Sequence, residues 1–503
     1  MRRRLPLIIC LILGVYTLPA MAFDPSEYRQ NTYGPPNRYC DPTRTLNSNG
    51  SGTLSDPWNM SQCATQPVAG NVVGVLPGVS VRLPTTNSSR TPAFNPSNSG
   101  TIDRRIVYVT KHAAVALAGV ETNPLRTELR HDGGAPYISG GAGAGTGAPM
   151  YGANSRNYIT FDGFYVDMAQ AYMSEDSGVI RSQDARGIHF RNFVIKGATL
   201  SVASNAVIYR PHNAVDTVLS NFRAYDFINI PTGSTTPQNA LFSDQYGDQN
   251  FLIEHFEIRN TQRGIFLKGT TPGPRFNYGT IRYGIVSDVS SCYQFNDLDT
   301  VNTTTLQYSL CYNTTRGGGV VMSSETSPAR NLVIDHVTVA KVDGENMDTE
   351  GGIITRNNGI ASNVIITNNI IDNNNGRYGH QISLRNTLPA TMSNNAYYKN
   401  GGTETYAYNG TQYNSLSSWL AAINGRDATS QELSSSPFVD RTNNNFRIRD
   451  GHALKSASST GGELGAYGGN QTVGVDISGS TGGTSDLTPP ATPVGIQLLL
   501  TAP

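Results

Sequence analysis

The sequence predicts an all-β chain in which short parallel strands wind into a solenoid. Two β-branched runs, Leu332 to Val339 and Val364 to Ile371, have almost the same pattern, and turn residues bound each of them. Runs this short and this rich in Ile, Val and Thr favour strands over helices. The polar residues His336 and Asn368 follow the first strand of each unit, and they are 32 residues apart. A period of this size indicates a repeat architecture, which we expect to be a coil of three strands.

The same corner position recurs along the chain at intervals of 25 to 34 residues. Small, amide or imidazole side chains suit a bend with left-handed backbone, or one in which the side chain bonds its own turn. Stacked amides would then form a ladder of hydrogen bonds from coil to coil. We therefore expect one stacked corner at Gly163, Asn192, Asn221, His255, Gly284, Ser309, His336, Asn368 and Asn394.

On these repeats, residues 39 to 468 resemble the right-handed parallel β-helix of the pectate-lyase-like superfamily. The stretch YCDPTRTLNSNGSGTLSDPWNMSQC is similar to the opening segment of many secreted β-helix proteins, where Trp58 would plug the open end of the solenoid. Near the other end, NSLSSWLAAINGRD indicates a short helix from Leu416 to Ile423 within a closing segment. The resemblance implies the fold, and it leaves the reaction open.

The chain is expected to divide into a leader, a solenoid with covered ends and a tail. Three arginines, an apolar run and Ala-Met-Ala are typical of a secretory signal, cleaved after Ala22, so the protein would be secreted or periplasmic. A Gly, Ser, Thr and Pro-rich composition favours a flexible tail from Asn470. The expected parts are 1–22 signal peptide, 23–110 N-terminal cap and first coils, 111–400 parallel β-helix, 401–469 C-terminal cover with a short helix, and 470–503 flexible tail.

Composition limits the partners. Without the three leader arginines, 34 basic residues stand against 37 acidic ones, a formal net charge of −3. Overall charge therefore predicts no nucleic-acid binding, and any affinity for a polyanion must be local. After the leader, no apolar run is long enough to span a bilayer. We expect a monomer.

Four cysteines remain in the mature chain: Cys40, Cys63, Cys292 and Cys311. An even number in an exported protein favours two disulfides, and of the three possible connectivities we expect the nearest pairs, 40 with 63 and 292 with 311. Four free thiols are the alternative. The chain has no Cys-x-x-Cys or Cys/His cluster of the kind that binds zinc.

Function has to come from outward side chains, and the glycine-led strand of each coil carries the candidates. We align residues 178–184, 205–213, 239–246, 264–269, 292–299, 319–325, 352–357 and 380–386. Their outward positions would form a column of charges along one face, at about 4.8 Å per coil. Solvated surface charge is the alternative interpretation. The cations of this column are Arg210, Lys268, Arg356 and Arg385, and the acids are Asp244, Asp297, Asp299 and Glu325.

The resemblance implies a polysaccharide lyase that cleaves an acidic, uronate-containing polysaccharide by β-elimination. This reaction needs a base and a neutralised carboxylate. Lys268 is the expected base, with Arg210 and Arg356 as catalytic cations and Arg385 and His212 as substrate-binding residues. Asp244, Asp297, Asp299 and Glu325 would supply oxygen ligands for Ca²⁺, the one cofactor expected.

Other functions stay open from the sequence. The main alternative is a non-catalytic β-helix that binds glycans or serves as a cell-surface scaffold. Arg210-Pro211-His212-Asn213 resembles the Asp-Pro-His-Asp motif of alginate C5-epimerases, but it lacks both aspartates. Glycoside hydrolysis would need two facing carboxylates, and Asp297, Asp299 and Glu325 are the residues to provide them.

Overall fold

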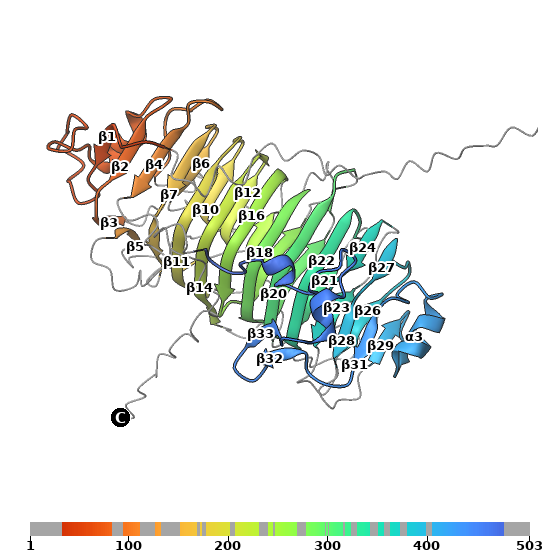
Figure 1. Cartoon of the computed structure of the whole chain (residues 1–503). Helices are drawn as coiled ribbons and strands as arrows, with labels where there is room; N and C mark the ends of the chain where they lie inside the picture. Colours follow the sequence, from red (N-terminus) through yellow and green to blue (C-terminus); the bar gives the residue numbers. More distant parts are fainter. Residues whose placement is uncertain are drawn as a thin grey trace, which may run out of the picture. The chain divides into compact units, whose positions relative to one another are not determined.

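The computed structural model describes residues 33–476, apart from 83–93, 111–125, 132–150, 169–171, 174–177, 202–206, 231–239, 245–246, 269–277, 297, 300, 315–316, 323–328, 343–350, 357–362, 373–379 and 399–404. In these residues the chain winds into stacked coils whose strands pair in parallel from one coil to the next (Figure 1). A typical coil adds one strand to sheet B and then crosses sheet A on both sides of a sharp bend. The architecture is the right-handed parallel β-helix that the sequence predicts. The expected leader, residues 1–22, lies outside the described residues.

Sheet A forms the larger part of the coil wall. Its strands are β1 (Arg38–Cys40), β2 (Val72–Val75), β3 (Gly78–Arg82), β4 (Ile106–Thr110), β5 (Thr127–His131), β7 (Ile159–Asp162), β8 (Tyr165–Asp167), β9 (Tyr172–Met173), β11 (His189–Ser201), β13 (Ala214–Val215), β14 (Val218–Ile230), β16 (Asp248–Arg259), β18 (Tyr278–Val289), β20 (Thr304–Thr314), β22 (Leu332–Val342), β24 (Val364–Thr367), β25 (Ile370–Asp372), β27 (Thr391–Ser393), β28 (Ala396–Tyr398) and β31 (Gln431–Leu433).

Sheet B contains the glycine-led strands. They are β6 (Tyr151–Asn154), β10 (Gly178–Gln183), β12 (Val207–His212), β15 (Ala240–Asp244), β17 (Arg263–Lys268), β19 (Ser291–Asn296), β21 (Gly318–Met322), β23 (Gly351–Thr355), β26 (His380–Leu384), β29 (Thr405–Tyr408) and β30 (Thr411–Tyr413). The other elements are the pair β32 (Phe438–Asp440) and β33 (Asn445–Ile448), the helices α2 (Met60–Thr65) and α3 (Leu416–Ala422), and the 3₁₀ turns η2 (Ala453–Ser456) and η3 (Gly468–Asn470).

One bend per coil divides the strands of sheet A, and it has left-handed backbone. Its φ angle is 47° at Asn192, 55° at Asn221 and 57° at Asn368. Strand pairing places Asn192 beside Asn221, and it places Asn368 beside Asn394. Asn221 Nδ2 donates to Asn192 Oδ1 at 2.7 Å, so amide side chains join neighbouring coils as the strands do. The predicted corner is confirmed at these four asparagines.

Two of the predicted corner positions are wrong by one residue. The bend lies at Tyr283 (φ 56°) and Tyr308 (φ 47°), not at Gly284 and Ser309. Gly284 points into the coil, where an added Cβ would lie 2.0 Å from the Phe256 ring. The small residue is therefore required by the core, and the corner itself accepts a large side chain because it faces outward.

Aromatic rings replace the amides in the middle of this corner. His255, Tyr283, Tyr308 and His336 stack on successive coils, with ring centroids 4.8, 5.7 and 4.8 Å apart. The spacing follows the distance between neighbouring parallel strands, so each coil brings its ring into stacking contact with the next. The corner thus has asparagines at both ends, with Asn192 and Asn221 bonded to each other, and an aromatic stack between them.

A second amide ladder lies inside the solenoid, one residue after the corner. Asn369 Nδ2 donates to Asn395 Oδ1 at 3.0 Å, and Asn395 Nδ2 donates to Asp427 Oδ1 at 3.1 Å. All three residues are fully buried. Because a buried amide without partners is costly, the ladder fixes the register of the last coils. Sequence reasoning placed the ladder at the corner and missed this inner one.

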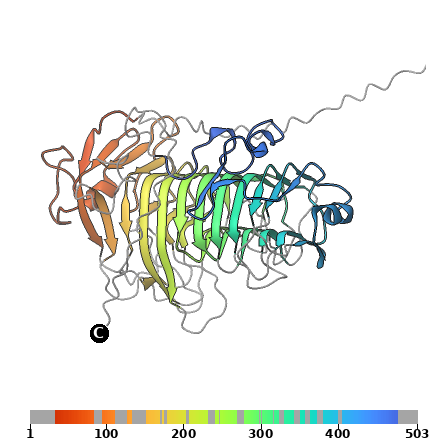
Figure 2. The same ribbon diagram turned by 60° about the horizontal axis from the view of Figure 1, so that its bottom comes forward.

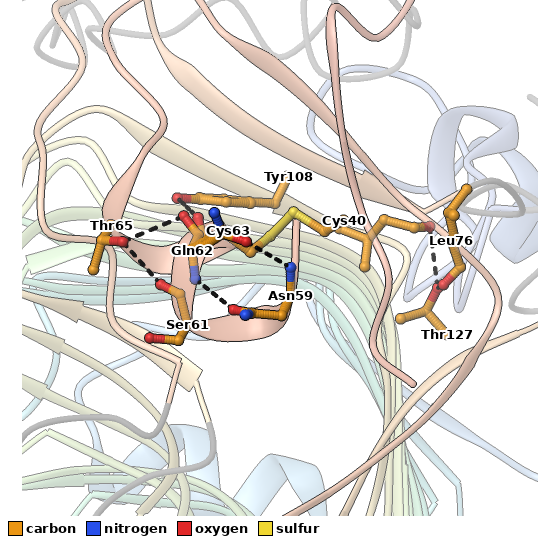
Figure 3. The surroundings of a disulfide bond; sticks show 10 residues. Cys40, Asn59, Ser61, Gln62, Cys63, Thr65, Leu76, Tyr108 and Thr127 are labelled. Carbon is orange, nitrogen blue, oxygen red and sulfur yellow. Dashed lines mark hydrogen bonds between the residues drawn. A yellow bond between two sulfur atoms is a disulfide. The ribbon is translucent and has the colours of Figure 1, made fainter. Parts of the chain in front are cut away.

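The predicted disulfide pairs are confirmed. Cys40 is bonded to Cys63, and Cys292 to Cys311, with Cα separations of 5.8 and 5.9 Å. Figure 3 shows the first disulfide holding α2 against β1. Asn59 caps this helix by accepting from the Gln62 backbone N–H at 2.9 Å.

Trp58 lies in the hydrophobic core at the N-terminal end, and only 7% of it is exposed. Gly52 packs against its ring: an added Cβ would lie 2.4 Å from the indole, and the glycine has a φ of 80°. Both features require glycine at this position. The prediction that Trp58 covers the end of the solenoid agrees with this packing.

The opposite end is closed by α3. Trp419 of this helix is fully buried, and its ring stacks on Tyr406 of β29 at 5.8 Å. The Ser415 side chain caps the helix by accepting from the Ser418 backbone N–H at 3.2 Å. The helix predicted from Leu416 to Ile423 is confirmed, one residue shorter at its end. No helix in the described part of the chain is long and apolar enough to cross a membrane.

Residues 436–476, here called the strap, run back along the outside of sheet A (Figure 2). Gly465 N–H donates to Asn368 O, and Gly474 N–H donates to Tyr283 O, each at 2.9 Å. Asp476 N–H donates to Asn221 Oδ1 at 2.7 Å, so contacts continue beyond Asn470, the predicted start of the tail. The strap buries an apolar outer face formed by Ile285, Leu310, Ala340, Ile370 and Ala396.

Removal of the Asn368 side chain should destabilise the fold. Asn368 Nδ2 donates to Asp335 Oδ1 at 2.7 Å, and its Oδ1 accepts from Ser459 N–H at 2.8 Å. Asn368→Ala removes these two hydrogen bonds and places alanine in left-handed backbone, so we expect a loss of about 1–3 kcal/mol in the free energy of unfolding. Urea denaturation measures it. Asn368→Gly keeps the backbone freedom, so it separates the hydrogen bonds from the strain; an alanine variant as stable as the wild type would contradict the stabilising role of these two bonds.

Asp248 predicts a specific pH dependence of stability. Burial raises its pKa to about 7, although Tyr209 Oη donates to its Oδ2 at 3.2 Å. The folded state therefore holds a proton that the unfolded chain has released above its ordinary pKa of about 3.9. The contribution of Asp248 to the free energy of unfolding is highest below about pH 3.9 and falls as the pH rises towards 7. The advantage of Asp248→Asn over the wild type should grow between about pH 4 and pH 8, by up to about 4 kcal/mol. Thermal unfolding at both pH values checks it, and an advantage independent of pH would contradict it.

Candidate functional site

The outer face of sheet B is the face on which the sequence places the candidate residues. The aligned segments do form its strands, and Ile265, Tyr293, Val320 and Ile353 lie level with one another in the core. The residue after each of these points to the other side, because side chains alternate along a strand. This outer row, here called the middle row, contains Arg181, Arg210, Ser243, Phe266, Gln294, Val321, Ile354 and Ser383.

A second outward row, here called the edge row, lies two residues further along each strand. Pairing places His212 beside Gln183, and it places Lys268 beside Asn296. Arg356 and Arg385 follow the paired ends of β23 and β26 on neighbouring coils. The structure thus brings His212, Lys268, Arg356 and Arg385 onto one row, and Arg210 onto the row beside it. The side chain of Lys268 lies outside the described residues.

Two arginines stand side by side at the N-terminal end of the middle row. Arg181 of β10 pairs with Arg210 of β12, and each is only 2% exposed. Glycine is required at Gly178 next to them, because an added Cβ would lie 2.9 Å from Arg210 Cβ. Both guanidinium groups thus lie beneath the surface of this part of the face. Their planar donor groups suit recognition of carboxylates.

His212 lies at the edge of the same two coils, beside a carboxylate. Asp184 Oδ1 is 3.8 Å from His212 Nδ1 and accepts from Asn213 Nδ2 at 3.0 Å. Gln183 Nε2 donates to the other oxygen of Asp184 at 3.2 Å. The aspartate is thus held in place next to the imidazole, an arrangement that suits proton transfer or binding of a hydroxyl group. The Asp184–His212 pair and the two arginines form a cluster on β10 and β12.

Sequence reasoning missed Arg181 and Asp184. Both appear once the segment GVIRSQD is laid over VIYRPHN, because Arg181 then matches Arg210 and Asp184 matches Asn213. This match between neighbouring coils is the signal that could have identified both residues from the sequence. Asp184 therefore lies on the coil that precedes the Arg-Pro-His-Asn segment, beside Asn213.

The middle row is not a continuous column of charge, contrary to the prediction. Val321 and Ile354 are fully buried, and Phe266 is 4% exposed. Arg263 lies over the Phe266 ring with its Cζ 4.9 Å from the centroid. Polar and cationic groups of the middle row are therefore concentrated towards the N-terminal coils.

Of the predicted calcium ligands, Asp299 is the one whose side chain the structure describes. Asp299 Oδ1 accepts from the backbone N–H groups of Val301 and Asn302 at 2.7 and 2.6 Å, so it stabilises a turn. Asp244 pairs with Leu267 and is level with the core row, not with Lys268. Asp297 and Glu325 lie outside the described residues. In the part of the chain that the structure describes, no three His, Cys, Asp or Glu side chains gather as metal ligands would.

The comparisons with known proteins leave the reaction open. No family model and no curated protein matches the sequence. Among solved structures, the chain is similar to pectate lyase Pel9A, at 13% identity and a TM-score of 0.49 over 86% of this chain and 97% of that one. A rhamnogalacturonan lyase matches at 13% identity and a TM-score of 0.47, over 80% of this chain and 90% of that one. A PL6 family polysaccharide lyase from Pseudopedobacter saltans matches at 11% identity and a TM-score of 0.30, over 83% of this chain and 97% of that one.

Proposed function

We propose that the chain is an exported polysaccharide lyase that cleaves an acidic polysaccharide on the outer face of sheet B. The observation that carries the proposal is the pair of buried arginines, Arg181 and Arg210, on the same face as the edge row of His212, Lys268, Arg356 and Arg385. A coil spacing of about 4.8 Å is similar to the length of a sugar unit, so a polymer lying along the solenoid meets a new coil at each unit.

The chemistry follows from what β-elimination requires. The proton next to the uronate carboxylate becomes acidic when a cation neutralises the carboxylate, which is the role of Arg210, while Arg356 binds the carboxylate of a neighbouring unit. Lys268 takes that proton, the electron pair forms the carbon–carbon double bond as the bond to the glycosidic oxygen breaks, and the leaving oxygen takes a proton from water. Arg385 and His212 hold neighbouring units.

The proposed export is consistent with the choice of substrate. A leader at residues 1–22 and two disulfides suit a protein that works outside the cytoplasm, where structural polysaccharides are found. The acidic nature of the polymer rests on the cations of the middle and edge rows. The net charge of the whole chain has no part in it, since the formal balance is zero before cleavage of the leader.

A second candidate is a glycan-binding β-helix without catalysis. The observation in its favour is that the C-terminal half of the middle row includes the buried residues Val321 and Ile354, which offer no acid or base. Hydrolysis is the weaker alternative, because the one described member of the predicted acid group, Asp299, is bonded to a backbone turn. An epimerase would need the Asp184–His212 pair as its acid–base group.

Lys268→Ala should abolish the release of unsaturated product from a panel of polyuronates, measured by its ultraviolet absorbance. An outward strand residue contributes little packing, so we expect stability to change by about 0.5 kcal/mol or less. His212→Ala is the matched variant on the same row, and it should retain elimination with weaker binding. The opposite pattern would make His212 the base. A wild type that gives no unsaturated product, with or without added Ca²⁺, would rule out the lyase and favour the binding protein.

Arg356→Ala should weaken binding of the polymer more than it slows the chemical step. The variant loses one charge-assisted contact to a carboxylate and keeps the base, so KM should rise about tenfold while kcat changes little. Added salt should reduce the difference between this variant and the wild type, because screening weakens exposed charge contacts. A fall in kcat with KM unchanged would instead place Arg356 at the reacting unit.

A further inference from the structure

A second charged surface lies on the opposite part of the coil wall, on sheet A after the corner. Strand pairing aligns outward residues of five successive coils there, and we call this row the flank strip. Beyond these coils, the same face of sheet A is covered by the strap. The flank strip consists of Arg130, Asp167, Lys196, Tyr225 and Arg259.

The carboxylates on and beside the flank strip already have partners. Glu128 is paired with Arg126 and Arg130, at 2.5 and 2.6 Å. Glu257 accepts from Arg223 at 2.9 Å.

Two further acids complete the set. Asp167 is 4.0 Å from Arg130 Nε. Asp226, at the next bend, accepts from Asn260 Nδ2 at 2.8 Å. These contacts leave the acids engaged with protein groups.

Lys196 and Arg259 differ from the other cations because neither forms an ion pair within the described residues. They lie on the two coils that flank Tyr225, with Lys196 Nζ 5.9 Å and Arg259 Cζ 5.0 Å from its ring centroid. Tyr225 itself is buried, and both cations remain partly exposed. Val475, near the end of the strap, packs against Tyr225 and holds the ring in place. The ring thus positions two charges before any ligand arrives, which lowers the entropic cost of binding.

The spacing of the two cations identifies the ligand. Two coil steps separate Lys196 from Arg259 by about 10 Å. An extended polyuronate presents carboxylates on the same side at every second sugar, a separation of similar size. A small anion would engage only one cation, whereas a polymer can engage both.

We propose that Lys196 and Arg259 bind carboxylates of an acidic polysaccharide on this flank, apart from the face of sheet B. The inference extends the proposed function, since the polymer class is the same. A long chain would be retained on the flank while another part of it occupies sheet B. A short oligosaccharide cannot reach both surfaces, so its cleavage should not depend on the flank.

The test compares the Lys196→Ala/Arg259→Ala double variant with the wild type by affinity gel electrophoresis in polygalacturonate and polymannuronate. At low salt the double variant should bind about fivefold more weakly, and high salt should remove the difference. Replacing Lys196→Ala by Lys196→Arg in the double variant should restore part of the binding. Arg447→Ala is the matched control, because Arg447 also lies over a tyrosine, Tyr467, at 4.5 Å but belongs to the strap; its affinity should be unchanged. Circular dichroism establishes that each variant is folded.

Several outcomes would overturn the inference. They are wild-type affinity in the double variant, an equal loss in Arg447→Ala, or a wild type that binds neither polymer. The release of unsaturated product from a short oligouronate tests sheet B separately. If binding depends on Lys196 and Arg259 but no such product forms, the lyase proposal is wrong. The proposed binding on the flank strip then still holds.

Discussion

Each coil must turn through one sharp bend with left-handed backbone, and the stacking of these bends sets the register of the solenoid. Parallel strands can slip by a residue unless something pins them, and a slip of one residue would exchange core and surface side chains. Here the pins are amide contacts such as Asn221 to Asn192, the ring stack through Tyr283 and Tyr308, and the buried ladder at Asn369. Every outward row of side chains depends on this register.

The strap shows how the same constraint is reinforced from outside. Its backbone N–H groups bond to the corner at Asn368, Tyr283 and Asn221, so one segment is attached to bends far apart along the solenoid. It also covers apolar residues that the coils leave on the outside of sheet A. A solenoid buries a continuous core only between its coils, so a chain segment that covers an outer apolar face removes a surface that would otherwise favour association.

The site illustrates how a repeat protein builds chemistry from neighbouring coils. Arg181 and Arg210 belong to different coils, as do Asp184 and His212, and each pair meets because parallel pairing puts equivalent residues side by side. Neither pair is a motif along the chain. Such a site changes by substitution of one coil at a time, while the hydrogen bonds of the sheet stay the same.

The sequence by itself determined the coil architecture, the disulfide pairs, the helix that closes the solenoid and the row that carries Lys268, Arg356 and Arg385. These follow from local patterns: β-branched runs, a period near 30 residues and the spacing of cysteines. Only the tertiary structure decided that Tyr283 forms the bend, that Asp299 serves a turn, that Val321 and Ile354 are buried, and that Asp184 meets His212. These features depend on contacts between residues a full coil apart. The side chains of the next coil decide whether a given side chain is buried, forms a turn or meets a partner.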